Sequence, residues 1–157
     1  MPKLDLSSLP VRTGSTYPAT LAAKMAGRSS LRLSDAAGLT QFGANLVRLE
    51  PGAMSSLRHW HETQDELVFV TEGALILRDD FGDTPLAVGD CATFPAGEAN
   101  GHHILNLSDA PGSFLVIGTR TDTDTGWYPD LDLKVTSDRN GHRYTRRDGS
   151  PLDPENS

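Results

Sequence analysis

Residues 52–73 read GAMSSLRHWHETQDELVFVTEG, which contains two short strand-like runs separated by polar turn formers. Successive side chains of an extended strand point to opposite faces, so His59 and His61 share one face and Trp60 takes the other, where we expect it to pack. The second run begins at Glu66 and can return beside the first. The pattern therefore predicts a strand pair in which Glu66 lies near both imidazoles.

The same kind of pattern continues along most of the chain. From Ser30 onward, runs of four to eight residues are interrupted by Gly, Pro, Asp and Asn at intervals near ten residues. This spacing is typical of an all-β sandwich or barrel. We expect strands at residues 30–33, 42–50, 55–61, 66–72, 74–79, 85–88, 91–94, 102–107, 113–119 and 142–146.

The chain has 157 residues, which fits one domain. Residues 1–40 are expected to form an N-terminal arm whose short helix, framed by Pro18 and Gly27, packs on the barrel. Residues 41–146 form the single barrel, and residues 147–157 form a frayed polar tail.

Composition excludes several functions. Fourteen basic against 21 acidic residues give a net charge of −7, which disfavours binding to nucleic acid. No apolar run exceeds four residues, so none can cross a membrane, and the first residues lack the apolar stretch of a signal peptide. We expect a cytoplasmic protein. The single cysteine, Cys91, excludes a thiolate metal cluster and is expected to be a small buried hydrophobe.

Four of the five histidines, His59, His61, His102 and His103, fall into two tight pairs. A His-x-His on a strand is more often a surface pair than a metal site, but Glu66 on the same face would add a carboxylate. Two imidazoles and a carboxylate suit one divalent transition metal, namely Fe, Mn, Ni or Zn.

One histidine of the second pair would complete such a site, because adjacent strand residues face opposite ways. With His102 inward, Ile104 and Asn106 share its face. With His103 inward, Leu105 and Leu107 share its face, which is the more apolar pattern. The residue pattern alone leaves both assignments open.

The order of these residues resembles the two motifs of the cupin superfamily over about residues 45–120. The motif positions are Gly52, His59, His61, Glu66 and Gly73, followed by Gly89, Pro95, Gly97, His102 and Asn106. The strings Arg-His-Trp-His at 58–61 and Pro-Ala-Gly at 95–97 with Asn-Gly-His-His at 100–103 are similar to those of short single-domain bacterial cupins, a subgroup with no assigned reaction. Six residues separate Gly52 from His59 and four separate Gly97 from His102, more than in the motifs.

The resemblance implies a double-stranded β-helix, or jelly roll, and the metal ligands His59, His61, Glu66 and His102. It favours a metal-dependent enzyme acting on a small organic substrate, with dioxygenase, isomerase and lyase or decarboxylase reactions all open. The alternatives are a non-catalytic small-ligand binding or sensing cupin, and a structural or storage module with an incidental metal. Glu98 and Asn100 are candidates either for the mouth of the pocket or for a simple turn.

Two further expectations concern packing. The interior is predicted to include Leu46, Val68, Val70, Leu77, Ile104 and Val116. Leu67 and Phe69 would then point outward and leave apolar sheet surface exposed, which favours a homodimer.

Overall fold

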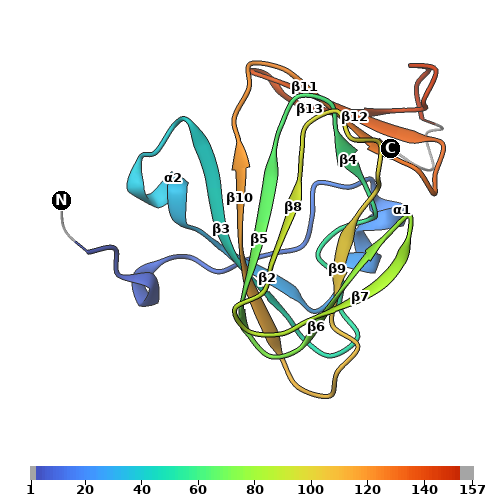
Figure 1. Ribbon diagram of the computed structural model, residues 1–157. Helices are drawn as coiled ribbons and strands as arrows, with labels where there is room; N and C mark the ends of the chain where they lie inside the picture. Colours follow the sequence, from blue (N-terminus) through green and yellow to red (C-terminus); the bar gives the residue numbers. More distant parts are fainter. Residues whose placement is uncertain (1–2, 153–157) are drawn as a thin grey trace.

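The computed structural model describes residues 3–152, which fold mainly into β-strands with a few short helices (Figure 1). The strands are β1 (Arg12–Thr13), β2 (Arg28–Arg32), β3 (Phe42–Leu49), β4 (Trp60–His61), β5 (Glu66–Glu72), β6 (Leu75–Asp79), β7 (Gly82–Leu86), β8 (Cys91–Phe94), β9 (His103–Leu105), β10 (Gly112–Thr119), β11 (Asp124–Tyr128), β12 (Leu133–Asp138) and β13 (Gly141–Thr145). The helical segments are η1 (Leu6–Ser8), α1 (Ala19–Ala22), η2 (Ala23–Met25) and α2 (Leu33–Ala37). None of the described helices is long and apolar enough to cross a membrane.

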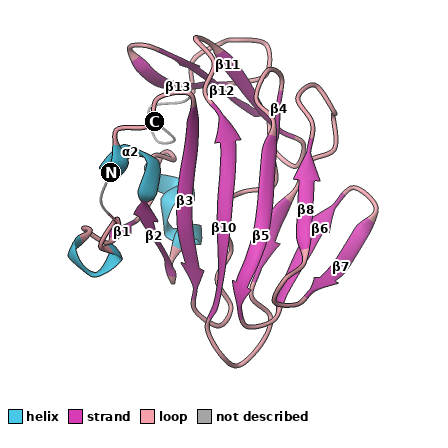
Figure 2. Cartoon of the chain, turned by 60° about the vertical axis from the view of Figure 1, so that its left-hand side comes forward, coloured by secondary structure: helices cyan, strands magenta, loops and turns pink. Residues whose placement is uncertain are grey.

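The strands form a jelly-roll barrel, as predicted. A six-stranded sheet has the order β1-β2-β3-β10-β5-β8, and its long central strands run side by side in Figure 2. The remaining strands form a four-stranded sheet, β13-β12-β11-β4, and a three-stranded sheet, β7-β6-β9. Strands distant in sequence, such as β3 and β10, are neighbours in the sheet. The all-β double-stranded β-helix is thereby confirmed.

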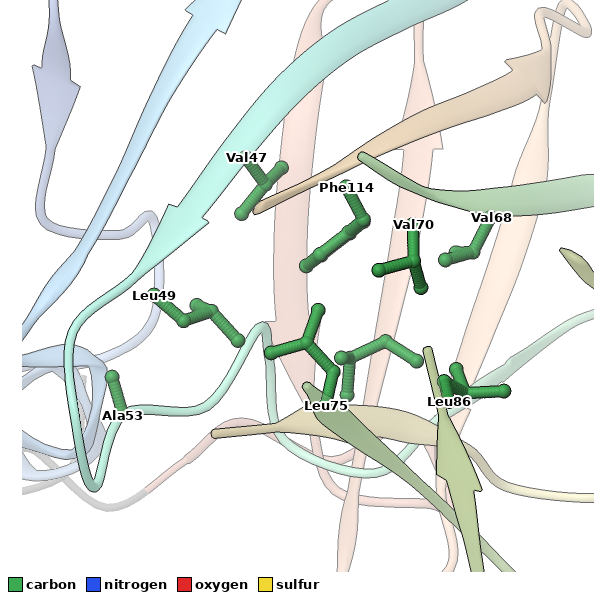
Figure 3. Close-up of a cluster of buried hydrophobic side chains, with 9 residues drawn as sticks. Val47, Leu49, Ala53, Val68, Val70, Leu75, Leu86 and Phe114 are labelled. Atoms are coloured by element: carbon green, nitrogen blue, oxygen red, sulfur yellow. The ribbon is translucent and has the colours of Figure 1, made fainter. Parts of the chain in front are cut away.

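Apolar side chains of both walls meet inside the barrel (Figure 3). The buried cluster consists of Val47, Leu49, Ala53, Val68, Val70, Leu75, Leu86, Ile104 and Phe114, with Leu77, Phe94 and Val116 packed against it. Leu46 is the one predicted interior residue that does not join this cluster. Val47 and Leu49 take the inward positions of β3 instead, so Leu46 falls on the outer face, between Leu31 and Leu115 of the neighbouring strands.

The N-terminal segment joins the barrel sheet. Strand β1 precedes the predicted helix, which begins at Ala19, and β2 follows it; β2 pairs with β3, and β1 pairs with β2 (Figure 2). The division at residue 40 remains a prediction. Of the tail, residues 153–157 lie outside the described residues, whereas Arg147 donates hydrogen bonds to the carbonyls of Tyr128 and Pro129, both at 2.9 Å.

Two regions differ from the predicted strands. Of the expected run 55–61, only Trp60–His61 is a strand. Strands β11 and β12 were not predicted, because their alternation is carried by few apolar residues. Leu133 and Val135 of β12 are buried in a second apolar cluster with Met25, Leu57 and Tyr128.

The outer face of the six-stranded sheet carries apolar residues, among them Phe69, whose side chain is 41% exposed. It lies opposite Leu115 on one side and Cys91 on the other. The prediction that Cys91 is buried is wrong, because it points outward from β8 and is exposed. The homodimer stays a prediction.

Candidate metal centre

Three predicted ligands converge inside one end of the barrel. Each of His59, His61 and Glu66 offers one ligand atom, and these atoms all lie within 4.8 Å of one another. All three side chains are half-buried. Two imidazoles and a carboxylate at such distances can hold a divalent transition metal.

The backbone explains why the two histidines point to one place. His61 lies in β4, two residues beyond His59, so period-two alternation sends both rings to the same side. Their ring centroids are 4.9 Å apart. Glu66 is the first residue of β5 and lies on the inward face that continues with Val68 and Val70.

His102 lies beside His59 on the neighbouring segment of the chain. Its backbone exchanges two hydrogen bonds with His59, at 3.1 Å and 2.9 Å, in an isolated antiparallel bridge. The His102 residue is 3% exposed, and its Nε2 lies 3.6 Å from Glu66 Oε1. The ring stacks on Phe94 with centroids 3.4 Å apart. Its position places a third imidazole beside the other three side chains.

His103 is held differently. Its Nδ1 lies 2.9 Å from the carbonyl oxygen of Ser56. Its neighbours Ile104 and Leu105 are 2% and 5% exposed, so both faces of this strand are covered by apolar packing. The apolar pattern could therefore not decide which histidine turns toward Glu66.

Each of the three imidazoles near Glu66 has its Nδ1 engaged away from the cluster. His59 Nδ1 lies 2.9 Å from the Leu57 carbonyl oxygen, and His102 Nδ1 lies 3.4 Å from that of Asn100. Nδ1 of His61 lies 2.6 Å from Asp124 Oδ2. Because a carbonyl or carboxylate oxygen fixes the proton on Nδ1, each Nε2 keeps a lone pair for an ion.

Asp124 is the site residue that the sequence did not reveal. It begins β11, is 6% exposed, and accepts hydrogen bonds from the backbone and the hydroxyl of Thr63, both at 2.9 Å. These bonds leave Oδ2 directed at His61. The only sequence signal was the polar alternation that starts at Asp124, and it lacks the apolar residues that mark a strand.

Burial and charge set the protonation of the site. Burial, reinforced by the neighbouring His61, lowers the pKa of His59 to about 4. For Glu66, burial opposes ionisation, but the neighbouring imidazoles, with His102 Nε2 3.6 Å from Glu66 Oε1, lower its pKa below the ordinary value. Burial also opposes protonation of His61, yet the Asp124 hydrogen bond and the Glu66 charge raise its pKa. A neutral His59 and an ionised Glu66 are the forms that bind a metal.

The donor set fits a metal ion on independent grounds. Nε2 of His102 is fully buried and has no hydrogen-bond partner within residues 3–152, and although the same is true of His103 Nε2, the His102 nitrogen is the one that lies 3.6 Å from Glu66 Oε1. A buried polar atom without a partner is costly, and an ion coordinated there would satisfy it. We therefore keep His59, His61, Glu66 and His102 as the proposed ligands.

The loop before His102 is fixed by Arg58. Its guanidinium makes a two-pronged contact with Asp130, with N–O distances of 3.0 Å and 2.6 Å. It also pairs with Asp80 and reaches the carbonyl of Gly101 at 3.4 Å. The Asn100 side chain accepts a hydrogen bond from the Asp80 backbone at 2.9 Å. Arg58 and Asn100 thus tie together the loops that carry the ligands.

Two cavities adjoin the cluster and share His102 and Gln64 as lining residues. The larger, of about 620 Å³, is also lined by His59 and Glu66. The smaller, of about 240 Å³, reaches His61, Glu98 and Asn100. Trp60, expected to pack away from the site, stacks on Trp127 at 6.2 Å but also lines the smaller cavity.

Comparison with known proteins supports these observations. A family model described as a cupin domain matches residues 45–118. No match is found among the curated proteins. A solved structure from Silicibacter pomeroyi, named as a sugar phosphate isomerase from a cupin superfamily, is 61% identical, with 99% of each chain covered and a TM-score of 0.96.

Two other solved structures are more distant. A protein from Acidithiobacillus ferrooxidans, to which sugar phosphate isomerase activity has been ascribed, is 30% identical, with 82% of this chain and 81% of that chain covered and a TM-score of 0.73. A polyketide cyclase from Streptomyces resistomycificus is 19% identical, covers 76% and 79% of the two chains with a TM-score of 0.63, and shows the fold alone. Since the most similar of these relatives spans nearly the whole chain and the family model covers both motifs, the chain belongs to the cupin superfamily and carries a cupin type-2 domain.

Proposed function

We propose that the protein is a metal-dependent sugar phosphate isomerase, which interconverts an aldose phosphate and a ketose phosphate. The observation that carries this proposal is the half-buried His-His-Glu cluster beside a cavity of about 620 Å³, in a chain 61% identical to a protein named for that activity. An aldose and its ketose differ only in the position of hydrogen atoms on adjacent carbons. The reaction therefore needs no electron acceptor or second substrate.

His59, His61, Glu66 and His102 would hold the ion. A divalent metal bound there supplies Lewis-acid polarisation of the sugar carbonyl and its neighbouring hydroxyl. An ion held by these four side chains would keep part of its coordination open to the substrate. Those two oxygens lie on adjacent carbons, which matches a substrate bound through both of them.

The chain's own residues prepare this arrangement. The carbonyls of Leu57 and Asn100 and the carboxylate of Asp124 hold the Nδ1 protons, so the imidazoles need not reorient when an ion or substrate binds. The lowered pKa of His59, about 4, keeps that ring unprotonated at neutral pH.

The first test is the metal itself. The metal content of protein purified without added metal is measured by elemental analysis. The metal-free protein is then titrated with Fe, Mn, Ni and Zn. We expect about one ion per chain for the wild type and a clear loss in His59→Ala and Glu66→Gln. His142→Ala is the matched control, because His142 is exposed and bonded to Ser137 at 2.7 Å, outside the cluster.

The second test is turnover. The metal-loaded protein is incubated with a panel of aldose and ketose phosphates, and conversion is followed by NMR. Conversion of one pair, abolished by chelation and restored by the metal, supports the proposal. Absence of bound metal at any stoichiometry would contradict it. Tight binding of a sugar phosphate without conversion of any panel member would favour the non-catalytic ligand-binding cupin instead.

A further inference from the structure

The inward face of β2 lines the larger cavity with positive charge. Arg28, Ser30 and Arg32 alternate along this strand and pair with the inward residues of β3, among them Val47. Strand β1 places Arg12 opposite Ser30. The side chains of these four residues all line the cavity that His59 and Glu66 also line. Arginine thus reaches the cavity of the proposed metal centre in a chain whose net charge is −7.

The arginines of this cavity differ in their partners. Arg32 lies 3.5 Å from Asp35, and Arg120 also pairs with Asp35, so one carboxylate offsets both charges. No carboxylate within residues 3–152 pairs with Arg28 or Arg12. Nε of Arg28 is fully buried and has no hydrogen-bond partner there.

Burying this nitrogen without a partner is costly, because it loses its hydration and no protein group replaces the lost hydrogen bond. Burial, opposed in part by Tyr17, lowers the pKa of Arg28 from its ordinary value. A buried donor without a partner is explained where a ligand binds beside it, and an anion would supply both the acceptor and the counter-charge. Arginine presents a planar fork of donors that matches the oxygens of a phosphate group.

The surroundings of Arg28 suit such a ligand. Hydroxyl groups of Thr13, Thr16 and Ser30 line the same cavity and can donate to phosphate oxygens. Tyr17 connects the region to the proposed metal centre, because its hydroxyl accepts a hydrogen bond from the Leu57 backbone at 3.2 Å. Leu57 in turn holds His59 through its carbonyl.

We propose that Arg28, assisted by Arg12, binds the phosphate group of the substrate while the reacting carbons lie at the His-Glu cluster. That the anion is a sugar phosphate rests on the proposed function, whereas the anion subsite rests on the unpaired arginines. The cavity of about 620 Å³ falls within the range of roughly 300–1,000 Å³ usual for small-ligand sites. It can therefore contain both ends of one sugar phosphate.

The test is calorimetric binding of inorganic phosphate, glucose 6-phosphate and glucose to the protein, with and without metal. We expect glucose 6-phosphate to bind more tightly than glucose in both states. Arg28→Met keeps the aliphatic stem but removes the donors, and should weaken binding of both phosphates about 10-fold or more. Arg28→Lys keeps the charge without the fork and should restore part of the affinity.

Arg48→Met is the matched control. Arg48 lies on β3 opposite Ser29 of β2, but it points outward and pairs with Glu50 and Glu72 at 3.2 Å and 3.0 Å. The Arg48→Met substitution removes one positive charge outside the cavity, so phosphate affinity should stay at the wild-type value. If Arg28→Met fails to fold by circular dichroism, Arg12→Gln on the exposed strand β1 replaces it and should weaken phosphate binding several-fold.

Unchanged phosphate affinity in folded Arg28→Met, or in Arg12→Gln and Arg28→Lys together, would overturn the proposal. The two proposals can fail separately. Loss of phosphate binding in Arg28→Met, in a protein that converts no sugar phosphate, would retain the subsite and remove the isomerase. Sugar phosphate isomerisation with the same KM in the wild type and Arg28→Met would retain the isomerase and remove the subsite.

Discussion

The two halves of the barrel interior are built on the same strand but stabilised differently. On β5 the inward positions are Glu66, Val68 and Val70, so a carboxylate gives way to apolar side chains within one strand. Val68 and Val70 are 1% and 0% exposed and belong to the main apolar cluster. Glu66 faces the imidazoles. An inward position thus need not be apolar, provided that partners compensate for its burial.

The strands around these halves differ as well. The apolar half lies between long strands such as β3, β5 and β10, of eight, seven and eight residues. The histidine half depends on β4, which has two residues, and on the isolated bridge between His59 and His102. In this half, side-chain hydrogen bonds of Arg58 and Asp124 take the place of the backbone hydrogen bonds that longer paired strands would supply. Burial therefore sets the stability of the fold, while polar contacts set the geometry of the site.

The largest effect on stability is expected in the apolar half. Phe114 is 2% exposed and contacts the core from β10, so Phe114→Ala should lower the free energy of unfolding by about 3–5 kcal/mol. Urea denaturation of the metal-free protein measures it. Phe81→Ala is the control, because Phe81 is 89% exposed and should change stability by less than about 0.5 kcal/mol. Similar losses in both variants would show that the apolar half does not dominate.

In the histidine half we expect the reverse: a large effect on metal and a small one on the metal-free fold. His102→Ala removes a proposed ligand whose Nε2 lies 3.6 Å from Glu66 Oε1. His103→Ala removes a ring bonded to the Ser56 carbonyl. Elemental analysis should show metal lost from His102→Ala and retained by His103→Ala. The opposite result would make His103 the ligand.

Much of the fold was predictable, because turn formers and alternation mark most barrel strands directly. Leu46 shows the limit of that reasoning. Both faces of β3 carry apolar residues, so alternation cannot tell which face is inward, and pairing with β10 places Val47 and not Leu46 in the core. The prediction that Cys91 is buried was wrong for the same reason, since a small apolar residue fits either face of β8.

The proposed ligands were predictable where they are close in sequence. Period-two alternation turns His59 and His61 to one side, and the short turn after them brings Glu66 back to the same place. The predicted pairing of their two strands is wrong, because β4 lies in the four-stranded sheet and β5 in the six-stranded sheet. Asp124 and Arg28 could not be found this way. Each reaches the site only through tertiary pairing, of β11 with β4 and of β2 with β3, which no local pattern encodes.

The smallest expected effect in the histidine half comes from Asp124, which contacts a proposed ligand and is not one itself. Its Oδ1 accepts two hydrogen bonds from Thr63, which leaves Oδ2 at 2.6 Å from His61 Nδ1. In Asp124→Asn the amide oxygen can keep the Thr63 bonds, but the amide nitrogen then faces His61 as a donor. Nδ1 must accept that bond, and the ring proton moves to Nε2, where it blocks the ligand lone pair.

We therefore expect Asp124→Asn to weaken metal binding about 10- to 100-fold, measured by competition with a chelator of known affinity. Asp122→Asn is the control, because Asp122 lies two residues away with its side chain 82% exposed and paired with Arg139. Thr63→Val should have a smaller effect than Asp124→Asn, because it removes the hydroxyl bond but keeps the carboxylate. Wild-type metal affinity in all three variants would contradict the prediction, because it would show that the Asp124 carboxylate does not help His61 to bind the ion.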